Sequence, residues 1–212
     1  MSGRIKMPKK ESPLTALNSF LPEGSFQEVA HYLTHYKVHL TITRERQSIL
    51  GDYRNKIFDK NHRISINGNL NKYSFLITLL HELAHLLAHE KYGNKILAHG
   101  KQWKEEYGKI LSEFIPRNIF PAEIQKLLID NLKNPAATTC ADPYLTRELK
   151  KYDIKKEGYF FVEALPLGSL FKVPSGAIFK KGERIRKRFK CMEVSTKKIY
   201  LFSPVYEVAL VT

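Results

Sequence analysis

The chain has 212 residues, of which 43% are hydrophobic and 26% are charged. This balance is typical of a folded globular protein, and it excludes a chain that is disordered over most of its length. Lysine and arginine outnumber acidic residues by 35 to 21, giving a formal net charge of +14. Such a surplus favours a polyanionic partner, although a role in solubility would explain it equally well.

No stretch approaches the roughly 18 consecutive apolar residues of a membrane-spanning helix. The basic N-terminus also lacks the apolar core of a signal peptide. Only two cysteines occur, Cys140 and Cys191, which is too few for a four-cysteine zinc site and favours a reduced protein. We therefore expect a soluble cytoplasmic protein without a membrane partner.

Periodicity predicts an α+β region in the first two thirds of the chain. Residues 1–21 form a basic N-terminal segment that we expect to be partly disordered. Spacing of apolar residues then predicts a helix at 24–36, strands at 37–43, 48–54 and 62–68, and helices at 72–91, 101–114 and 122–132. Gly93 is suited to end the longest of these helices.

The composition changes around residues 134–139, and we place a domain boundary there, between domains at 22–135 and 136–212. Runs typical of strands follow at 159–165, 169–173, 177–181, 184–194, 197–203 and 205–211. The second domain is therefore predicted to be a small all-β module. Its expected core consists of Phe160, Phe161, Leu170, Phe171, Phe179, Phe189, Tyr200 and Phe202.

The feature that carries chemistry is the run His81-Glu82-Leu83-Ala84-His85. Histidines four apart on a helix share one face and can bind one metal ion together. Glu82 lies about 100° around the helix, where it can reach a water held at the metal's open position. This is the residue pattern of a zinc hydrolase with a glutamate base. Polar groups in so apolar a helix would otherwise be costly to bury.

A catalytic zinc site normally takes three protein ligands and a water, so a third ligand is needed. His89 lies two turns from His81 and has rotated about 80°, which places it poorly. Glu105 and Glu106, on the next helix, are suitable in type. His99, after a turn that contains Gly93, is equally suitable, and spacing alone leaves the choice open.

The segment HELAHLLAHEKYGNKILAHGKQWKEEYGKIL resembles the core of the SprT-like metalloprotease domain, to which the eukaryotic Spartan proteases belong. In that family, HExxH is followed by a loop, a histidine-glycine pair and an aromatic residue three positions later. Here these positions are His99, Gly100 and Trp103. The similarity covers roughly residues 22–135 and includes LGDYR and ISING upstream of the helix.

The resemblance implies that His81, His85 and His99 hold one catalytic Zn²⁺ and that Glu82 is the catalytic residue. It also implies a zincin-like metalloprotease core with a small antiparallel sheet. The expected substrate is a protein, and DNA-crosslinked proteins are the substrates of Spartan proteases. Many members end in a cysteine-bearing zinc ribbon. The C-terminal module here has a similar length and strand content, but it cannot hold a structural zinc with two cysteines.

The densest charge lies in KKGERIRKRFK, residues 180–190. We predict a strand there, from which Arg184, Arg186 and Arg188 project as one cationic stripe that binds DNA. The full set of candidate nucleic-acid-binding residues is Lys180, Lys181, Arg184, Arg186, Lys187, Arg188 and Lys190. The alternative is a solvated strand edge whose charges prevent aggregation.

Two other functions compete with a zinc metalloendopeptidase. In the first, zinc only braces a module that binds nucleic acid or protein; Glu82 argues against it, because a structural site has no use for that residue. In the second, the enzyme hydrolyses a phosphodiester, but the sequence offers no second metal site and no phosphate-binding loop.

Overall fold

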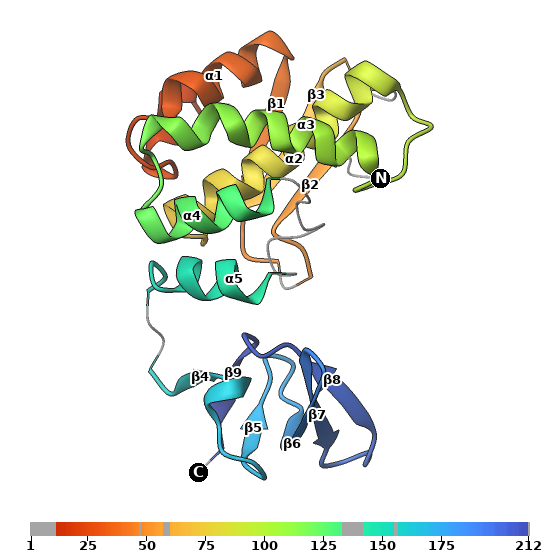
Figure 1. Ribbon diagram of the computed structural model, residues 1–212. Coiled ribbons are helices and arrows are strands. Elements are labelled where there is room, and N and C mark those ends of the chain that lie inside the picture. Colours follow the sequence, from red (N-terminus) through yellow and green to blue (C-terminus); the bar gives the residue numbers. More distant parts are fainter. Residues whose placement is uncertain (1–11, 47, 57–59, 133–141, 155–156, 212) are drawn as a thin grey trace, which may run out of the picture. The chain divides into compact units, whose positions relative to one another are not determined.

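The computed structural model describes residues 12–46, 48–56, 60–132, 142–154 and 157–211 (Figure 1). The chain divides into two compact units, Met1–Pro135 and Ala136–Thr212. The domain boundary expected at 134–139 therefore falls among residues outside the described ranges. Among the described residues, none of the helices combines the length and the apolar character needed to cross a membrane.

The N-terminal unit begins with the short 3-10 helix η1 (Leu14–Ser19), followed by helix α1 (Phe26–His35). Leu17 of η1 and the following Leu21 are buried, so this end of the basic segment is ordered, while residues 1–11 lie outside the described ranges. Three strands follow, which are β1 (Val38–Thr43), β2 (Gly51–Arg54) and β3 (His62–Asn67).

These strands form a mixed sheet, so the expectation of an antiparallel sheet was wrong. Their order is β1-β3-β2, with β1 parallel and β2 antiparallel to β3. The chain leaves β1 and crosses the end of β3 to reach the other edge. Arg46 holds this crossing by donating to Asn67 Oδ1 at 2.8 Å and to Ser65 Oγ at 2.9 Å. The crossing leaves β2 as an edge strand.

Helix α2 (Lys72–Tyr92) is the central element of the N-terminal unit. Asn71 begins it by accepting a hydrogen bond from the Ser74 amide at 2.9 Å, and Gly93 ends it with φ +72°. Because the helix is apolar around its circumference, it can be buried on more than one side. It packs against β2 and β3 and also against helix α3 (Lys101–Phe114) (Figure 1). Helices η2 (Ile115–Arg117) and α4 (Ala122–Asn131) complete the unit.

The C-terminal unit opens with helix α5 (Pro143–Lys150), which the sequence analysis did not predict. Its strands are β4 (Tyr159–Phe161), β5 (Leu170–Lys172), β6 (Ile178–Ile185), β7 (Arg188–Glu193), β8 (Ile199–Phe202) and β9 (Glu207–Leu210), with the 3-10 helix η4 (Val162–Ala164) after β4. Their order is β4-β9-β5-β6-β7-β8, and each neighbouring pair is antiparallel.

The core of this unit is only partly the one that was predicted. Phe171, Phe179 and Phe189 are buried, and Phe202 packs against them. Three of the predicted core residues, Phe160, Leu170 and Tyr200, are about two fifths exposed. Val162, Leu165, Cys191 and Val208 fill the remaining core positions. Cys191 is a free, buried thiol, so it acts as a small apolar side chain, and Cys140 lies outside the described residues.

Candidate metal centre

Helix α2 carries His81, Glu82 and His85 near its middle. The two histidines are one turn apart, so both imidazoles leave the helix on the same side, where they are partly buried. Their Nε2 atoms lie 3.2 Å from each other. The surrounding apolar residues of α2 are fully buried, which fixes the helix and therefore the starting points of both side chains.

His99 reaches this pair from the loop between α2 and α3. Its backbone has φ +59°, a conformation that costs free energy in any residue other than glycine. The turn is closed by the Gly100 amide, which donates to the Leu97 carbonyl at 2.9 Å. As a result, His99 Nε2 lies 3.1 Å from His81 Nε2 and 3.0 Å from His85 Nε2.

The three Nε2 atoms form a triangle that suits one metal ion. Two nitrogens bound tetrahedrally at the usual zinc distance are separated by about 3.3 Å, close to the separations found here. Hydrogen bonding cannot account for this approach. Each neutral Nε2 is either a donor or an acceptor, so two of the three must be alike and repel one another. A cation among them would remove that repulsion, and the residues therefore fit a bound zinc.

The surroundings keep these imidazoles neutral, as metal ligands must be. Burial, together with repulsion between the imidazoles, lowers the pKa of His81 to about 3 and that of His85 to about 4. Burial also lowers the pKa of His99. At neutral pH all three rings consequently have a lone pair available without first losing a proton.

Glu82 is 6% exposed and lies between α2 and the edge strand β2. A Cβ added at Gly51 would come within 2.6 Å of its Oε1, so the carboxylate occupies space that only a glycine leaves open. The pKa of Glu82 is raised to about 8, mainly by burial and also by the nearby Asp52, while Arg46 acts in the opposite direction. Its pKa is therefore close to neutral pH, which suits a group that accepts a proton and later returns it.

Two aromatic residues of α3 form one wall of the cluster. Trp103 is fully buried, with its ring centroid 4.7 Å from those of His81 and His99. Tyr107 stacks on Trp103 at 4.9 Å. Burial raises the pKa of Tyr107, so its hydroxyl stays protonated. Because their rings contact the imidazoles at tilted or edge-on angles, these residues limit the orientations that the histidines can adopt.

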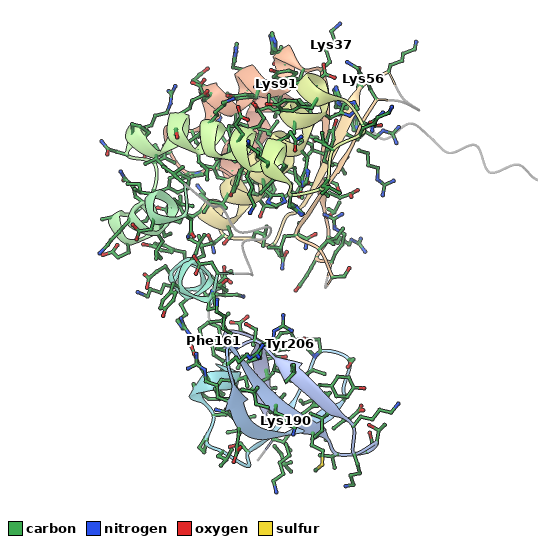
Figure 2. All side chains as sticks on the ribbon, turned by 45° about the vertical axis from the view of Figure 1, so that its right-hand side comes forward. Lys37, Lys56, Lys91, Phe161, Lys190 and Tyr206 are labelled. Carbon is green, nitrogen blue, oxygen red and sulfur yellow. The ribbon has the colours of Figure 1, made fainter. Side chains whose placement is uncertain are left out.

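Charged side chains join α2 to α3 beyond the histidines. Glu106, which is 8% exposed, accepts hydrogen bonds from Lys91 at 2.9 Å and from Lys109 at 3.0 Å. Lys91 lies at the C-terminal end of α2 (Figure 2), where the loop that carries His99 begins. The ion pair therefore holds together the two helix segments between which that loop runs.

A second group of side chains lies one turn farther along α2. The Tyr53 hydroxyl and His62 Nδ1 are hydrogen-bonded at 2.9 Å, and His62 Nε2 is 3.3 Å from Glu90. The ring of Tyr53 is parallel to that of His85, with centroids 6.4 Å apart, and it also contacts His89. This group supports His85 from the side of β2.

The alternatives for the third ligand lie outside the histidine triangle. Glu105 and Glu106 are both paired with Lys109, and His89 contacts Tyr53 and His62. Among the described residues, only His81, His85 and His99 form a group of three or more histidine, cysteine or acidic side chains that could hold one ion.

The basic residues of the C-terminal unit are arranged differently from the predicted stripe. Strand β6 ends at Ile185 and β7 begins at Arg188, so Arg186 and Lys187 form the turn between them. The expectation that Arg184, Arg186 and Arg188 share one face of a single strand was therefore wrong. Lys181 is buried and donates to main-chain carbonyls of Glu163 and Leu165, which removes it from the surface set. Lys180 and Lys190 are exposed on strands β6 and β7. Figure 2 shows Lys190 on the sheet of this unit.

Sequence reasoning missed the neighbours of Glu82 on the sheet side. Gly51 makes the closest approach, and Asp52 and Arg46 influence its charge. A usable signal was present, because a glycine within a predicted strand often marks the close approach of another group. The contributions of Asp52 and Arg46 depend on the crossing between β1 and β2, which spacing along the chain does not reveal.

Residues 23–124 match the SprT-like family. This range contains the sheet, α2, the loop with His99 and α3, and it ends within α4. No curated protein and no solved structure matches the chain. The C-terminal unit lies outside the matched range.

Proposed function

Because residues 23–124 match the SprT-like family, which is metallopeptidase-related, we propose that this protein is a zinc-dependent endopeptidase. The observation that carries the proposal is the triangle of Nε2 atoms from His81, His85 and His99 beside a buried glutamate. A site that only braced the fold would need no carboxylate at that position. Glu82 is buried there at a cost in free energy that a catalytic role explains.

The three histidines would hold the metal ion and leave one coordination position open. When bound, Zn²⁺ polarises a carbonyl group and lowers the pKa of a bound water towards ~7. Glu82 would take the proton of the attacking water as the water adds to the scissile carbonyl. The same carboxyl would then deliver that proton to the leaving nitrogen. With a pKa near neutrality, it can perform both transfers.

We further propose that the substrates are proteins bound or crosslinked to DNA. Support comes from the charge of the chain and from exposed Lys180, Arg184, Arg186, Lys187, Arg188 and Lys190 in the C-terminal unit. DNA bound there would raise the local concentration of DNA-associated proteins near the peptidase site. The cleavage site itself would then need little sequence preference.

The test is cleavage of a DNA-binding protein by the wild-type chain and by Glu82→Gln, with zinc content measured for both. We expect one zinc per chain in each protein and cleavage only by the wild type, with a loss in kcat of at least 100-fold in the variant. Glu105→Gln is the matched control, because it removes an exposed carboxylate outside the triangle.

The outcomes separate the proposals. Cleavage stimulated by DNA and lost in Glu82→Gln supports both the chemistry and the substrate class. Cleavage that DNA does not affect would support the peptidase activity but would exclude DNA-associated proteins as its substrate class. Equal cleavage by both proteins would assign the chemistry to another group, and zinc binding without any cleavage would favour a structural zinc site.

A further inference from the structure

The hairpin of β6 and β7 continues beyond the strands that flank it. Strand β5 pairs with β6 through Lys180, and Gly168 and Ser169, just before β5, hydrogen-bond to the Lys181 backbone. On the other side, β8 pairs with β7 only from Phe189 onward. Among the described residues, the sheet pairings of residues 182–188 are therefore those between β6 and β7 themselves. We call residues 182–188 the ribbon, since it is a two-stranded extension with both edges free.

The base of the ribbon is held in a fixed conformation. The register between β6 and β7 shifts between Lys181 and Arg184, and the bulge there changes the direction of the strand. A Cβ at Gly182 would lie 2.2 Å from the Lys190 carbonyl oxygen, so the two strands approach more closely than another residue would allow. The Lys181 ammonium also lies 4.3 Å from the Phe189 ring centroid while it binds two carbonyls. The ribbon is thus fixed at its base before any partner binds.

Positive charge covers the distal part of the ribbon. Arg184, Arg186, Lys187 and Arg188 are all exposed, and Glu183 is the single acidic residue. Salt bridges between the described residues include none of these four cations. Arg186 has φ +53°, so the turn keeps a cationic side chain at a position where glycine would be less strained.

The shape and composition of the ribbon indicate which polyanion it fits. A two-stranded β-ribbon fits the major groove of duplex DNA, about 12 Å wide, but not the minor groove, about 6 Å wide. Proteins that hold single strands use aromatic platforms for the bases, and the ribbon contains no aromatic residue. Insertion into a membrane would need an apolar face, and Ile185 is the only large apolar residue present.

We propose that the ribbon enters the major groove of duplex DNA, with its four cations directed at the phosphates of the groove walls. The proposal rests on the DNA-binding part of the proposed function and names the element and the form of DNA involved. Because phosphate contacts carry no sequence information, binding is insensitive to sequence and steeply dependent on salt. Four contacts predict a slope of roughly −3.6 in a plot of log K against log salt concentration.

The experiment measures binding of the full chain to a labelled duplex of mixed sequence, and to one of its strands, over a range of salt concentrations. The ribbon variant carries R184S, R186S, K187S and R188S. The matched control carries K151S, K172S, K197S and K198S, which removes four exposed charges from the same unit but outside the ribbon and outside the proposed DNA-binding set. We expect the ribbon variant to lose three to four units of the salt slope on duplex, and the control to lose about one or less.

A second measurement places the ribbon in a groove. Methylation of guanine N7 reports the major groove, and that of adenine N3 reports the minor groove. We expect wild-type protein to protect N7, and the ribbon variant to lose this protection. A third variant with R184K, R186K and R188K keeps the charges and should retain most of the salt slope, which would show that replacing the arginines does not by itself abolish binding.

The proposal is overturned if single strands bind more tightly than duplex, if adenine N3 alone is protected, or if the control variant loses as much binding as the ribbon variant. Cleavage of an unstructured peptide without DNA is measured in parallel, and the ribbon variant should retain it. A chain that fails to cleave any peptide but shows ribbon-dependent duplex binding would refute the peptidase and leave the ribbon proposal standing.

Discussion

Gly51 of the edge strand β2 faces Glu82 of α2 so closely that the added Cβ of an alanine would meet the Glu82 carboxylate at 2.6 Å and Thr78 Cγ2 at 2.8 Å. Sheet and helix are therefore fitted to each other at the candidate catalytic residue. We predict that Gly51→Ala displaces Glu82 and lowers peptidase activity at least tenfold while zinc content stays at one per chain. Crowding of this kind also destabilises a core by about 1–3 kcal/mol.

Gly108→Ala is the control for this substitution. Its Cβ would lie 3.4 Å from the Leu132 carbonyl oxygen, an ordinary contact, and alanine favours the helical backbone of α3. Activity and zinc content should both stay at wild-type levels. If Gly51→Ala retained full activity, Glu82 would have to tolerate displacement, and the close fit with β2 would be irrelevant to catalysis.

Helices of the N-terminal unit followed from the sequence because their signals are local. The helix predicted at 72–91 is α2 (Lys72–Tyr92), since Asn71 and Gly93 flank an unbroken apolar run. Helix α3 has the predicted bounds, and α4 ends one residue earlier than expected. The directions of the strands did not follow, because the crossing that makes β1 and β3 parallel depends on the contacts of Arg46 with β3.

In the candidate site, too, features set by nearby residues could be predicted, whereas those set by distant contacts could not. Helical spacing brought His81 and His85 together, whereas His99 is fourteen positions beyond His85 and was selected by resemblance to a family. Its place depends on a left-handed backbone conformation that histidine seldom adopts. The predicted arginine stripe failed for a related reason. Arg186-Lys187 is a turn without glycine, asparagine or aspartate, so no residue there indicated that the strand is divided.

The acidity of Glu82 predicts how the stability of metal-free protein depends on pH. Its folded pKa of about 8 is above the ordinary value of 4.5, so folding favours the protonated form. This contribution is complete below pH 4.5 and is lost as pH rises to 8. The histidines have pKa values that are lowered on folding, so their contribution to stability is lost as pH falls, and it changes only below their ordinary pKa of 6.5. Glu82 therefore dominates this balance between pH 6.5 and 8.

Urea unfolding of chelator-treated wild type and Glu82→Gln at pH 6.5 and pH 8 measures this effect. The free energy of unfolding of the wild type, relative to the variant, should fall by about 2 kcal/mol across this interval. Groups common to both proteins cancel in the comparison. A difference between the proteins that does not change with pH would mean that water reaches the Glu82 carboxylate in solution.

Glu106 and Glu105 are neighbours that share Lys91 and Lys109, yet only Glu106 is buried. We predict that Glu106→Ala weakens zinc binding several-fold, because it loosens α2 from α3 on either side of the loop that carries His99. Glu105→Ala should leave zinc affinity unchanged, since exposed ion pairs contribute little. Competition with a chromophoric chelator measures both. Equal effects of the two substitutions would show that net charge, and not the buried contact, matters to the metal site.

Two substitutions in the hairpin of β6 and β7 should change its stability in opposite directions. In Gly182→Ala the new Cβ would meet the Lys190 carbonyl oxygen at 2.2 Å, and because this is a main-chain atom the strands must separate. We expect a loss of about 3 kcal/mol or more. Arg186→Gly relieves the left-handed conformation at φ +53° and should be neutral or stabilising by up to about 1 kcal/mol.

Hydrogen exchange read by mass spectrometry can locate both effects. Gly182→Ala should remove protection from amides of β6, β7 and β8, whereas Arg186→Gly should preserve or raise it. The only tryptophan, Trp103, lies in the N-terminal unit and gives an independent fluorescence signal for the state of the metal centre. Normal protection in Gly182→Ala would mean that the bulge can relax, and the base of the ribbon would then be less rigid than its contacts require. In that case the charges of the ribbon could still bind DNA, but their alignment with a groove would have to come from the partner.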